Sequence, residues 1–191
     1  MLKKNIYDHT VLTCKDHTDL DKKTIKKFMS GYKLMENAGK IIFEIIKKKF
    51  NKNKNIKILC GSGNNGGDAF IVAKLLKENG FKNIELFCLI TKNKLKGDAK
   101  LAAEKININI QNISNLKITK GNLIIDGLLG SGLNKNIAGN LKKIIEKINS
   151  KNHYCISIDI PSGINGDTGE IKGVAVKSDL TITFTKKNPD I

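Results

Sequence analysis

Three glycine-containing segments carry side chains that could bind a ligand or transfer a proton. The first, 61–68, combines two adjacent asparagines with an aspartate; the second, 126–136, contains an aspartate and a lysine; the third, 159–163, places an aspartate before a proline. Glycines let a ligand approach the backbone, amides donate and accept hydrogen bonds, and a positioned carboxyl group can move a proton. These segments predict a site for a polar ligand with acid–base chemistry.

The first segment formally matches the dinucleotide pattern G-x-G-x-x-G, from Gly61 to Gly66. That pattern also requires an acidic residue at the end of the next strand, where this chain has Thr91 and Lys92. Asp68 would repel a pyrophosphate at the N-terminus of the following helix. The pattern alone is therefore weak evidence, and Asp68 is either a ligand-binding residue or a plain helix N-cap.

The second segment begins with Asp126, which ends a short apolar run. A carboxylate at that position is either bound by backbone N–H groups or functional. Gly130-Ser131-Gly132 can present successive backbone N–H groups to an anion, with Lys135 nearby. A glycine-rich turn without a chemical role is the alternative.

The third segment holds Asp159 at the end of another apolar run, and Pro161 stiffens the turn that follows. A carboxyl group fixed in a crevice suits general acid–base catalysis, because desolvation can raise its pKa toward neutrality. A structural Asx turn is the alternative.

The elements that must position these segments follow from hydrophobic periodicity. The first fifty residues predict two helices separated by a break at Ser30-Gly31, the first capped by Thr18 and Asp19 and ending at Phe28. Strands and helices then alternate, which predicts a Rossmann-like, three-layer α/β/α sandwich around a mostly parallel sheet. Ligands bind at the carboxyl edge of such a sheet. The expected strands are 56–60, 84–90, a half-exposed edge strand 106–113, 123–125, 154–158 and 180–184, and the further helices are 69–79, 98–105 and 141–148.

Length and composition exclude several classes of protein. A chain of 191 residues with 40% hydrophobic and 27% charged residues predicts one globular domain, with no run long enough to span a membrane. The net charge of +16 invites a nucleic-acid interpretation, but all 34 basic residues are lysine, without the arginine forks that read bases, so we expect no nucleic-acid partner. The start, 1–12, lacks the apolar region of a secretory signal, which predicts a cytoplasmic protein.

The four cysteines predict neither a zinc site nor disulfides. None forms a C-x-x-C pair or stands at a zinc-ligand spacing from a histidine, and Cys60, Cys88 and Cys155 lie in apolar runs. We expect these three to be buried and reduced.

Taken together and in this order, the motifs resemble one family. Besides the three segments, the resemblance rests on Leu34-Met35-Glu36-Asn37-Ala38-Gly39, and it continues through Asp167-Thr168-Gly169 to Thr181-Ile182-Thr183-Phe184. The chain is similar over nearly its whole length, 1–191, to the YjeF N-terminal domain, the NAD(P)H-hydrate epimerases. Such a match of four linked motifs is far more specific than a glycine pattern alone.

The resemblance implies an isomerase that interconverts the R and S epimers of hydrated NADH and NADPH, so that a dehydratase can complete their repair. It implies that Asp159 is the catalytic acid or base, that potassium binds at Asn65, Asp126 and Ser162, and that the domain forms a homodimer. The substrate contacts that it implies are Asn64, Asn65, Gly66, Gly67, Asp68, Gly130, Ser131, Gly132, Leu133, Asn134, Lys135, Asn136 and Asp159.

The chain departs from the family pattern at two positions, and the extent of the domain and two alternative functions are left open. Ser62 stands where the family often has proline, and Ala69 where it often has glycine. Family domains usually continue with a further strand, so the resemblance leaves open whether the domain is truncated at Ile191 or belongs to a longer bifunctional protein. A catalytically inactive dimeric scaffold or RNA-binding module of the same fold, and an NAD-dependent dehydrogenase, are the alternative functions.

Overall fold

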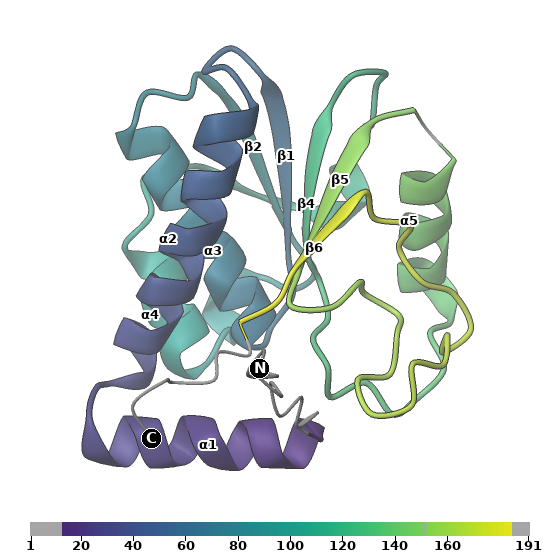
Figure 1. Cartoon of the computed structure of the whole chain (residues 1–191). Helices are drawn as coiled ribbons and strands as arrows, with labels where there is room; N and C mark the ends of the chain where they lie inside the picture. The colour runs from purple at the N-terminus through teal and green to yellow at the C-terminus, as the bar shows by residue number, and fades with distance from the viewer. Residues whose placement is uncertain (1–12, 151, 185–191) are drawn as a thin grey trace, which may run out of the picture.

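A six-stranded parallel sheet forms the centre of the molecule. The computed structural model describes residues 13–150 and 152–184. Within them the strand order is β3-β2-β1-β4-β5-β6, and every neighbouring pair is parallel, which confirms the predicted sheet (Figure 1). The strands are β1 (Asn55–Cys60), β2 (Asn83–Cys88), β3 (Ile110–Asn112), β4 (Leu123–Gly127), β5 (Tyr154–Ile158) and β6 (Leu180–Ile182).

Helices cover both faces of the sheet, so the three-layer prediction is confirmed (Figure 1). On one face lie α2 (Gly31–Lys49), α3 (Asn64–Glu78) and α4 (Gly97–Glu104); α5 (Gly139–Asn149) packs on the other. The predicted N-terminal helix, α1 (Cys14–Lys27), lies across the end of the sheet at which the parallel strands finish. Two 3₁₀ turns, η1 (Lys92–Lys94) and η2 (Ile113–Asn115), complete the described elements.

The core consists of two apolar clusters, one on each face of the sheet. In β1, Ile56, Ile58 and Cys60 pack with α2 and α3, whereas Leu59 belongs to the cluster beneath α5. This division follows from the alternation of side chains along a strand that is buried on both faces. The three cysteines expected in the core, Cys60, Cys88 and Cys155, are buried, and all four cysteines are free thiols.

Two helix starts differ from the prediction. Thr18 and Asp19 do not cap α1, because Thr13 and Asp16 form a capping box one turn earlier, with the Thr13 hydroxyl accepting from Asp16 N at 3.1 Å. Helix α3 begins at Asn64 rather than at residue 69, so the asparagines and Asp68 belong to its first turns. Asp68 is therefore not an N-cap. What was predicted for residues 1–12 lies outside the described part of the chain.

Candidate functional site

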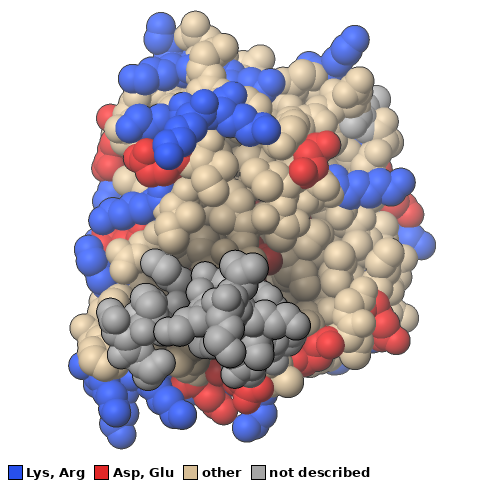
Figure 2. All heavy atoms as spheres, in the orientation of Figure 1, with Lys and Arg blue, Asp and Glu red and all other residues tan. Residues whose placement is uncertain are grey.

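A cavity of about 630 Å³ opens between α1 and the carboxyl edge of the sheet. Strand order reverses here, because β2 lies on one side of β1 and β4 on the other, and the loops after such strands diverge. Figure 2, drawn from the side with α1 at the bottom, shows a recess near the centre of the molecule, with mostly uncharged residues around it and lysines toward the periphery. Of the sequence-predicted ligand contacts, the cavity lining includes Asn64, Asn65, Asp68, Gly130, Ser131, Gly132, Leu133 and Asp159.

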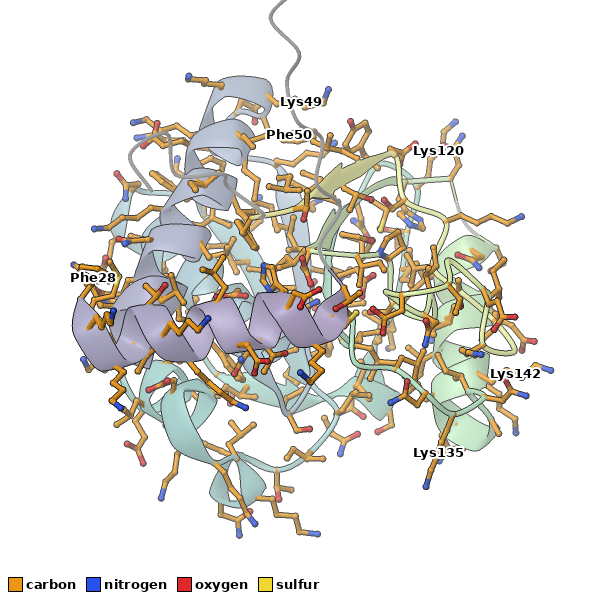
Figure 3. All side chains as sticks on the ribbon, turned by 60° about the horizontal axis from the view of Figure 1, so that its bottom comes forward. Phe28, Lys49, Phe50, Lys120, Lys135 and Lys142 are labelled. Atoms are coloured by element: carbon orange, nitrogen blue, oxygen red, sulfur yellow. The ribbon has the colours of Figure 1, made fainter. Side chains whose placement is uncertain are left out.

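The remaining predicted contacts lie elsewhere. Asn134, Lys135 and Asn136 are exposed and do not line the cavity, and Figure 3 shows Lys135 extending away from the molecule. Gly66 and Gly67 are buried in the first turn of α3: a Cβ on Gly66 would collide with the carbonyl of Gly61, and one on Gly67 with the Met35 side chain. These two glycines let the helix pack closely against its neighbours.

Asp126 lies at the end of β4, fully buried beneath the cavity. Its Oδ1 accepts from Ser162 Oγ at 2.6 Å and from Leu128 N at 3.2 Å, and its Oδ2 accepts from Ser157 Oγ and Ser162 N, both at 2.9 Å. Burial raises the pKa of Asp126, and these hydrogen bonds oppose that rise. The carboxyl group therefore joins β4, β5 and the 159–163 turn into one unit.

Asn65 and Ser162 extend this network to the cavity. The Asn65 amide donates to the Leu129 carbonyl at 2.9 Å and to the Ile158 carbonyl at 2.8 Å. Ser162 Oγ accepts from Leu129 N at 2.9 Å and lies 3.2 Å from the Leu129 carbonyl oxygen. Residues far apart in the chain thus meet at one point, where α3 and the ends of β4 and β5 converge.

The donor set at this point suits a hard cation. Asn65, Asp126 and Ser162 offer amide, carboxylate and hydroxyl oxygens, which are poor ligands for soft metals such as copper(I). Among the described residues, no lysine forms an ion pair with the buried Asp126 carboxylate. A buried carboxyl group is stabilised by hydrogen bonds, by protonation or by a bound cation, and the four hydrogen bonds of Asp126 supply the first of these. The same part of the chain contains no group of three or more His, Cys, Asp or Glu side chains arranged as a metal site.

Asp159 adopts an unusual backbone conformation. Its φ is 63°, the only positive φ of a non-glycine residue in the described chain. Its N–H donates to the Ile182 carbonyl at 2.7 Å, and its side chain, half-buried, lies 3.4 Å from Thr183 Oγ1. Non-glycine residues in the left-handed region are held there by their surroundings and are common at active sites. The turn therefore fixes the Asp159 carboxyl group at the cavity.

The cavity is acidic although the chain is strongly basic. Four aspartates and no lysine are among its described lining residues: Asp21, Asp68, Asp98 and Asp159. Burial, and then the charges of Asp159 and Asp21, raise the pKa of Asp68 well above its usual value. The Asp68 carboxyl group has no hydrogen bond or ion pair with another described residue. Such a cavity favours a neutral or cationic group over an anionic one.

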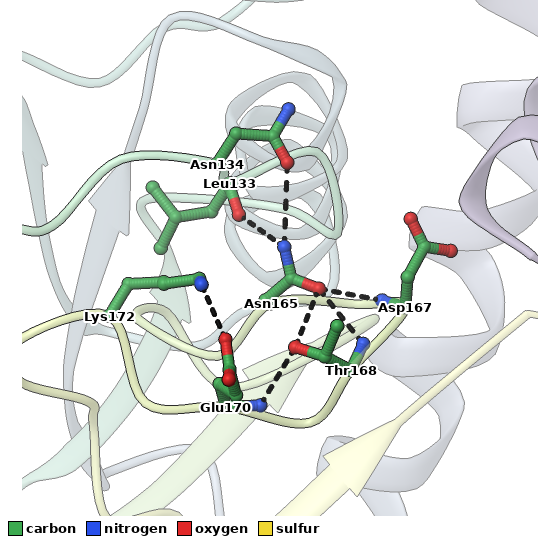
Figure 4. Close-up of polar contacts among 7 residues, drawn as sticks. All are labelled: Leu133, Asn134, Asn165, Asp167, Thr168, Glu170 and Lys172. Atoms are coloured by element: carbon green, nitrogen blue, oxygen red, sulfur yellow. Dashed lines mark hydrogen bonds and ion pairs between the residues drawn. The ribbon is translucent and has the colours of Figure 1, made fainter.

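Asn165 is a positioning residue that sequence reasoning missed. Its Nδ2 donates to the Leu133 carbonyl at 2.8 Å, and its Oδ1 accepts from Asp167 N at 3.0 Å and from Thr168 N at 2.9 Å (Figure 4). These bonds join the 128–136 loop to the 161–173 loop. Its position before Gly166-Asp167, two turn-forming residues, could have indicated such a role.

Helix α1 was also missed as part of the site. His17, Thr18, Asp21 and Ile25 line the cavity, and their spacing of about four residues places them on one helical face. The polar side chains on this face could have been found from the sequence.

In the part of the chain that the structure describes, no helix is both long enough and apolar enough to cross a bilayer.

Comparison with known proteins agrees with this architecture. The family described as YjeF-related protein N-terminus matches residues 31–189. The NAD(P)H-hydrate epimerase of Rhodopirellula baltica is 35% identical over 181 residues, which cover 91% of this chain and 73% of that protein. The bifunctional NAD(P)H-hydrate repair enzyme Nnr of Coxiella burnetii is 37% identical over 169 residues, 87% of this chain and 34% of that protein. This chain thus spans about a third of the bifunctional relative.

A solved structure supports the fold. The crystal structure of yeast ynu0, YNL200c, matches with a TM-score of 0.79 and 22% identity, over 92% of this chain and 80% of that chain. The family match covers most of the described residues, including α2, the whole sheet and both loops that hold Asp126 and Asp159. The chain therefore belongs to the YjeF-related protein N-terminus family.

Proposed function

We propose that this chain is an NAD(P)H-hydrate epimerase, which interconverts the R and S forms of hydrated NADH and NADPH. The observation that carries the proposal is the Asp159 carboxyl group, held by a left-handed turn at the wall of a cavity rich in carboxylates. The names of the relatives from Rhodopirellula baltica and Coxiella burnetii, both NAD(P)H-hydrate enzymes, support the same substrate class.

The substrate explains why an acidic cavity would be useful. In hydrated NADH, a hydroxyl group stands on the ring carbon next to the nitrogen. When Asp159 donates a proton to that hydroxyl, the C–O bond breaks, water leaves, and the nitrogen lone pair forms a C=N bond that carries positive charge. Carboxylates at fixed positions stabilise such developing positive charge without having to reorganise. Water then adds to the C=N carbon and gives a proton to a base at the cavity wall, such as the ionised Asp159 carboxylate, which regenerates the hydroxyl group.

Potassium is the cofactor that we propose, bound by Asn65, Asp126 and Ser162. Its charge would compensate the buried Asp126 carboxylate. Since Ser162 Oγ can rotate its hydrogen away from Asp126 Oδ1, now 2.6 Å from it, the oxygen could face the ion. These three residues would then hold the ends of β4 and β5 in place, and with them the Asp159 turn. The cation takes no part in the bond-breaking steps.

We further propose a homodimer in the cytoplasm that works with an NAD(P)H-hydrate dehydratase, on the same chain or a separate one. The bifunctional relative from Coxiella burnetii supports this coupling. Nucleic acid is not a proposed partner, because the basic residues are lysines scattered over several sides of the face drawn in Figure 2.

Replacement of Asp159 tests the proposal. Asp159→Asn keeps the shape of the side chain but cannot donate or accept the catalytic proton, so epimerisation should slow by about 10²-fold or more. The rate is measured by chromatographic separation of the two epimers. Asp19→Asn, the same change on the outer side of α1, is the matched control and should keep the wild-type rate. A normal rate for Asp159→Asn would remove Asp159 from the mechanism.

A further inference from the structure

The inner face of α1 is mostly polar, although a purely structural cover would be apolar. Its cavity-lining residues are His17, Thr18, Asp21 and one apolar residue, Ile25, and its apolar residues Leu20 and Ile25 are both 42% exposed. No residue of α1 is fully buried. Hydrophobic burial therefore explains the position of this helix poorly, and the side chains that it presents to the cavity need another explanation.

Polar contacts fix the first turn of α1 against the loops that flank Asp159. Cys14 N donates to Asp167 Oδ1 at 2.6 Å, and Cys14 Sγ lies 3.5 Å from the Ser131 carbonyl oxygen. The capping box at Thr13 stabilises the same turn. His17 lies one turn further along, so its position relative to the site is set by these anchors rather than by a mobile loop.

His17 and Asp159 face a common space from different elements. Both line the main cavity, and both line a second cavity of about 140 Å³ beside it. His17 belongs to α1, which lies across the end of the sheet, whereas Asp159 follows β5 at the edge of the sheet itself (Figure 1). A ligand in this space can therefore meet His17 from the helix and Asp159 from the end of the sheet.

Asp21 supports His17 from the next turn of the helix. His17 Nδ1 lies 3.7 Å from Asp21 Oδ2, which is too long for a hydrogen bond but close enough for an ion pair when the imidazole is protonated. Asp21 is itself partly buried: burial raises its pKa, the charge of Asp159 adds to the rise, and His17 opposes it. The pair thus resembles an acid–base group with its own orienting carboxylate.

We propose that His17 is a second catalytic residue, which takes up or delivers the proton on the face of the nicotinamide ring opposite Asp159, while Asp21 positions it. This inference rests on the proposed function and deepens it. A single carboxyl group returns water most readily to the face from which it left, which restores the starting epimer. Inversion needs a base on the other face.

The proton balance follows from this arrangement. Asp159 donates a proton to the departing hydroxyl group, and the C–O bond breaks to give water and the C=N cation. A second water attacks from the α1 side, forms the new C–O bond and gives its proton to His17 Nε2. After one turnover Asp159 is ionised and His17 is protonated, so the enzyme is ready to convert the other epimer, or it resets by proton exchange with solvent.

The experiment follows inversion and oxygen exchange separately. One purified epimer of hydrated NADH is incubated in ¹⁸O-labelled water, and chromatography with mass spectrometry reports both the other epimer and the label in the remaining starting epimer. In His17→Gln, inversion should fall by about 10²-fold or more. Label should still enter the starting epimer at close to the wild-type rate, because Asp159 still expels water and returns it to the same face.

Two further variants complete the test. Asp21→Asn should reduce inversion less than His17→Gln and leave the exchange unchanged, whereas Asp19→Asn, on the outer side of the helix, should change neither. Retained exchange also proves that the His17 variant is folded. Unchanged inversion in His17→Gln, or a parallel loss of inversion and exchange, would overturn the assignment of His17. If the wild-type chain catalysed neither process, the proposed function itself would fail, and this inference with it.

Discussion

The hydrogen bonds of Asp126 predict that two buried serines contribute unequally to stability. Ser157 Oγ donates only to Asp126 Oδ2, at 2.9 Å. Ser162 Oγ donates to Asp126 Oδ1 at 2.6 Å and also accepts from Leu129 N at 2.9 Å. Both serines are fully buried, and replacement by alanine removes the same single oxygen atom from each. The two variants therefore differ mainly in the groups that they leave without partners.

The expected losses follow from the number of broken bonds. A hydrogen bond to a charged group contributes about 1.5–3 kcal/mol, so Ser157→Ala should reduce the free energy of unfolding by about 2 kcal/mol. Ser162→Ala loses a similar bond and also leaves Leu129 N without an acceptor, which costs about 1–2 kcal/mol more. The total for Ser162→Ala is then about 3–4 kcal/mol.

Urea unfolding followed by circular dichroism measures these losses, because the chain has no tryptophan to report by fluorescence. Choline chloride as the only salt keeps potassium from contributing. The refuting result is a loss for Ser162→Ala equal to or smaller than that for Ser157→Ala. It would mean that the Leu129 N–H has another partner and that the network is not the unit described.

Three further predictions test the pKa of Asp68, the packing at Gly61 and potassium binding at Asp126. Burial raises the pKa of Asp68, so the folded state keeps a proton that the unfolded state releases at lower pH. The contribution of Asp68 to wild-type stability should therefore fall as pH rises through its folded-state pKa. In urea titrations at several pH values, Asp68→Asn should lack this contribution. A Cβ at Gly61 would collide with the Leu128 carbonyl, so Gly61→Ala should destabilise the chain by about 3 kcal/mol or more, and a thermal scan with an unchanged midpoint would be inconsistent with the packing. Potassium at about 100 times its dissociation constant should raise the unfolding free energy by about 2.7 kcal/mol over choline, and Asp126→Asn should abolish that increase.

The sheet could be predicted from the sequence because its central strands are buried on both faces. Such strands carry apolar side chains on both sides and therefore form continuous apolar runs in the sequence. The edge position of β3 followed from the alternating Ile and Asn residues of 106–113, but the strand is shorter than predicted: it spans only Ile110–Asn112, and Ile113 begins the 3₁₀ turn η2. Helix starts were harder. Two asparagines and two glycines at the start of α3 have low helix propensity, so the first turns of that helix were taken for a loop, whereas packing of Gly66 against Gly61 stabilises them as helix.

The parts of the candidate site that consist of acidic residues at strand ends could be predicted from the sequence. Asp126 and Asp159 at strand ends pointed to the carboxyl edge, and the structure brings Asp126 into contact with Ser162 and both loops. The positive φ of Asp159 depends on its bond to Ile182, 23 residues further along, and no local pattern encodes such a contact. His17 was missed for a similar reason: a histidine on a short amphipathic helix acquires meaning only when the helix crosses the cavity.

The reaction that we propose for this cavity is a reversible inversion at one carbon. Its most direct test starts two reactions, one from each purified epimer of hydrated NADH, with the wild-type chain in potassium chloride. Both reactions should reach the same epimer mixture, faster than identical samples without protein. A folded chain that accelerates neither reaction would contradict the proposal.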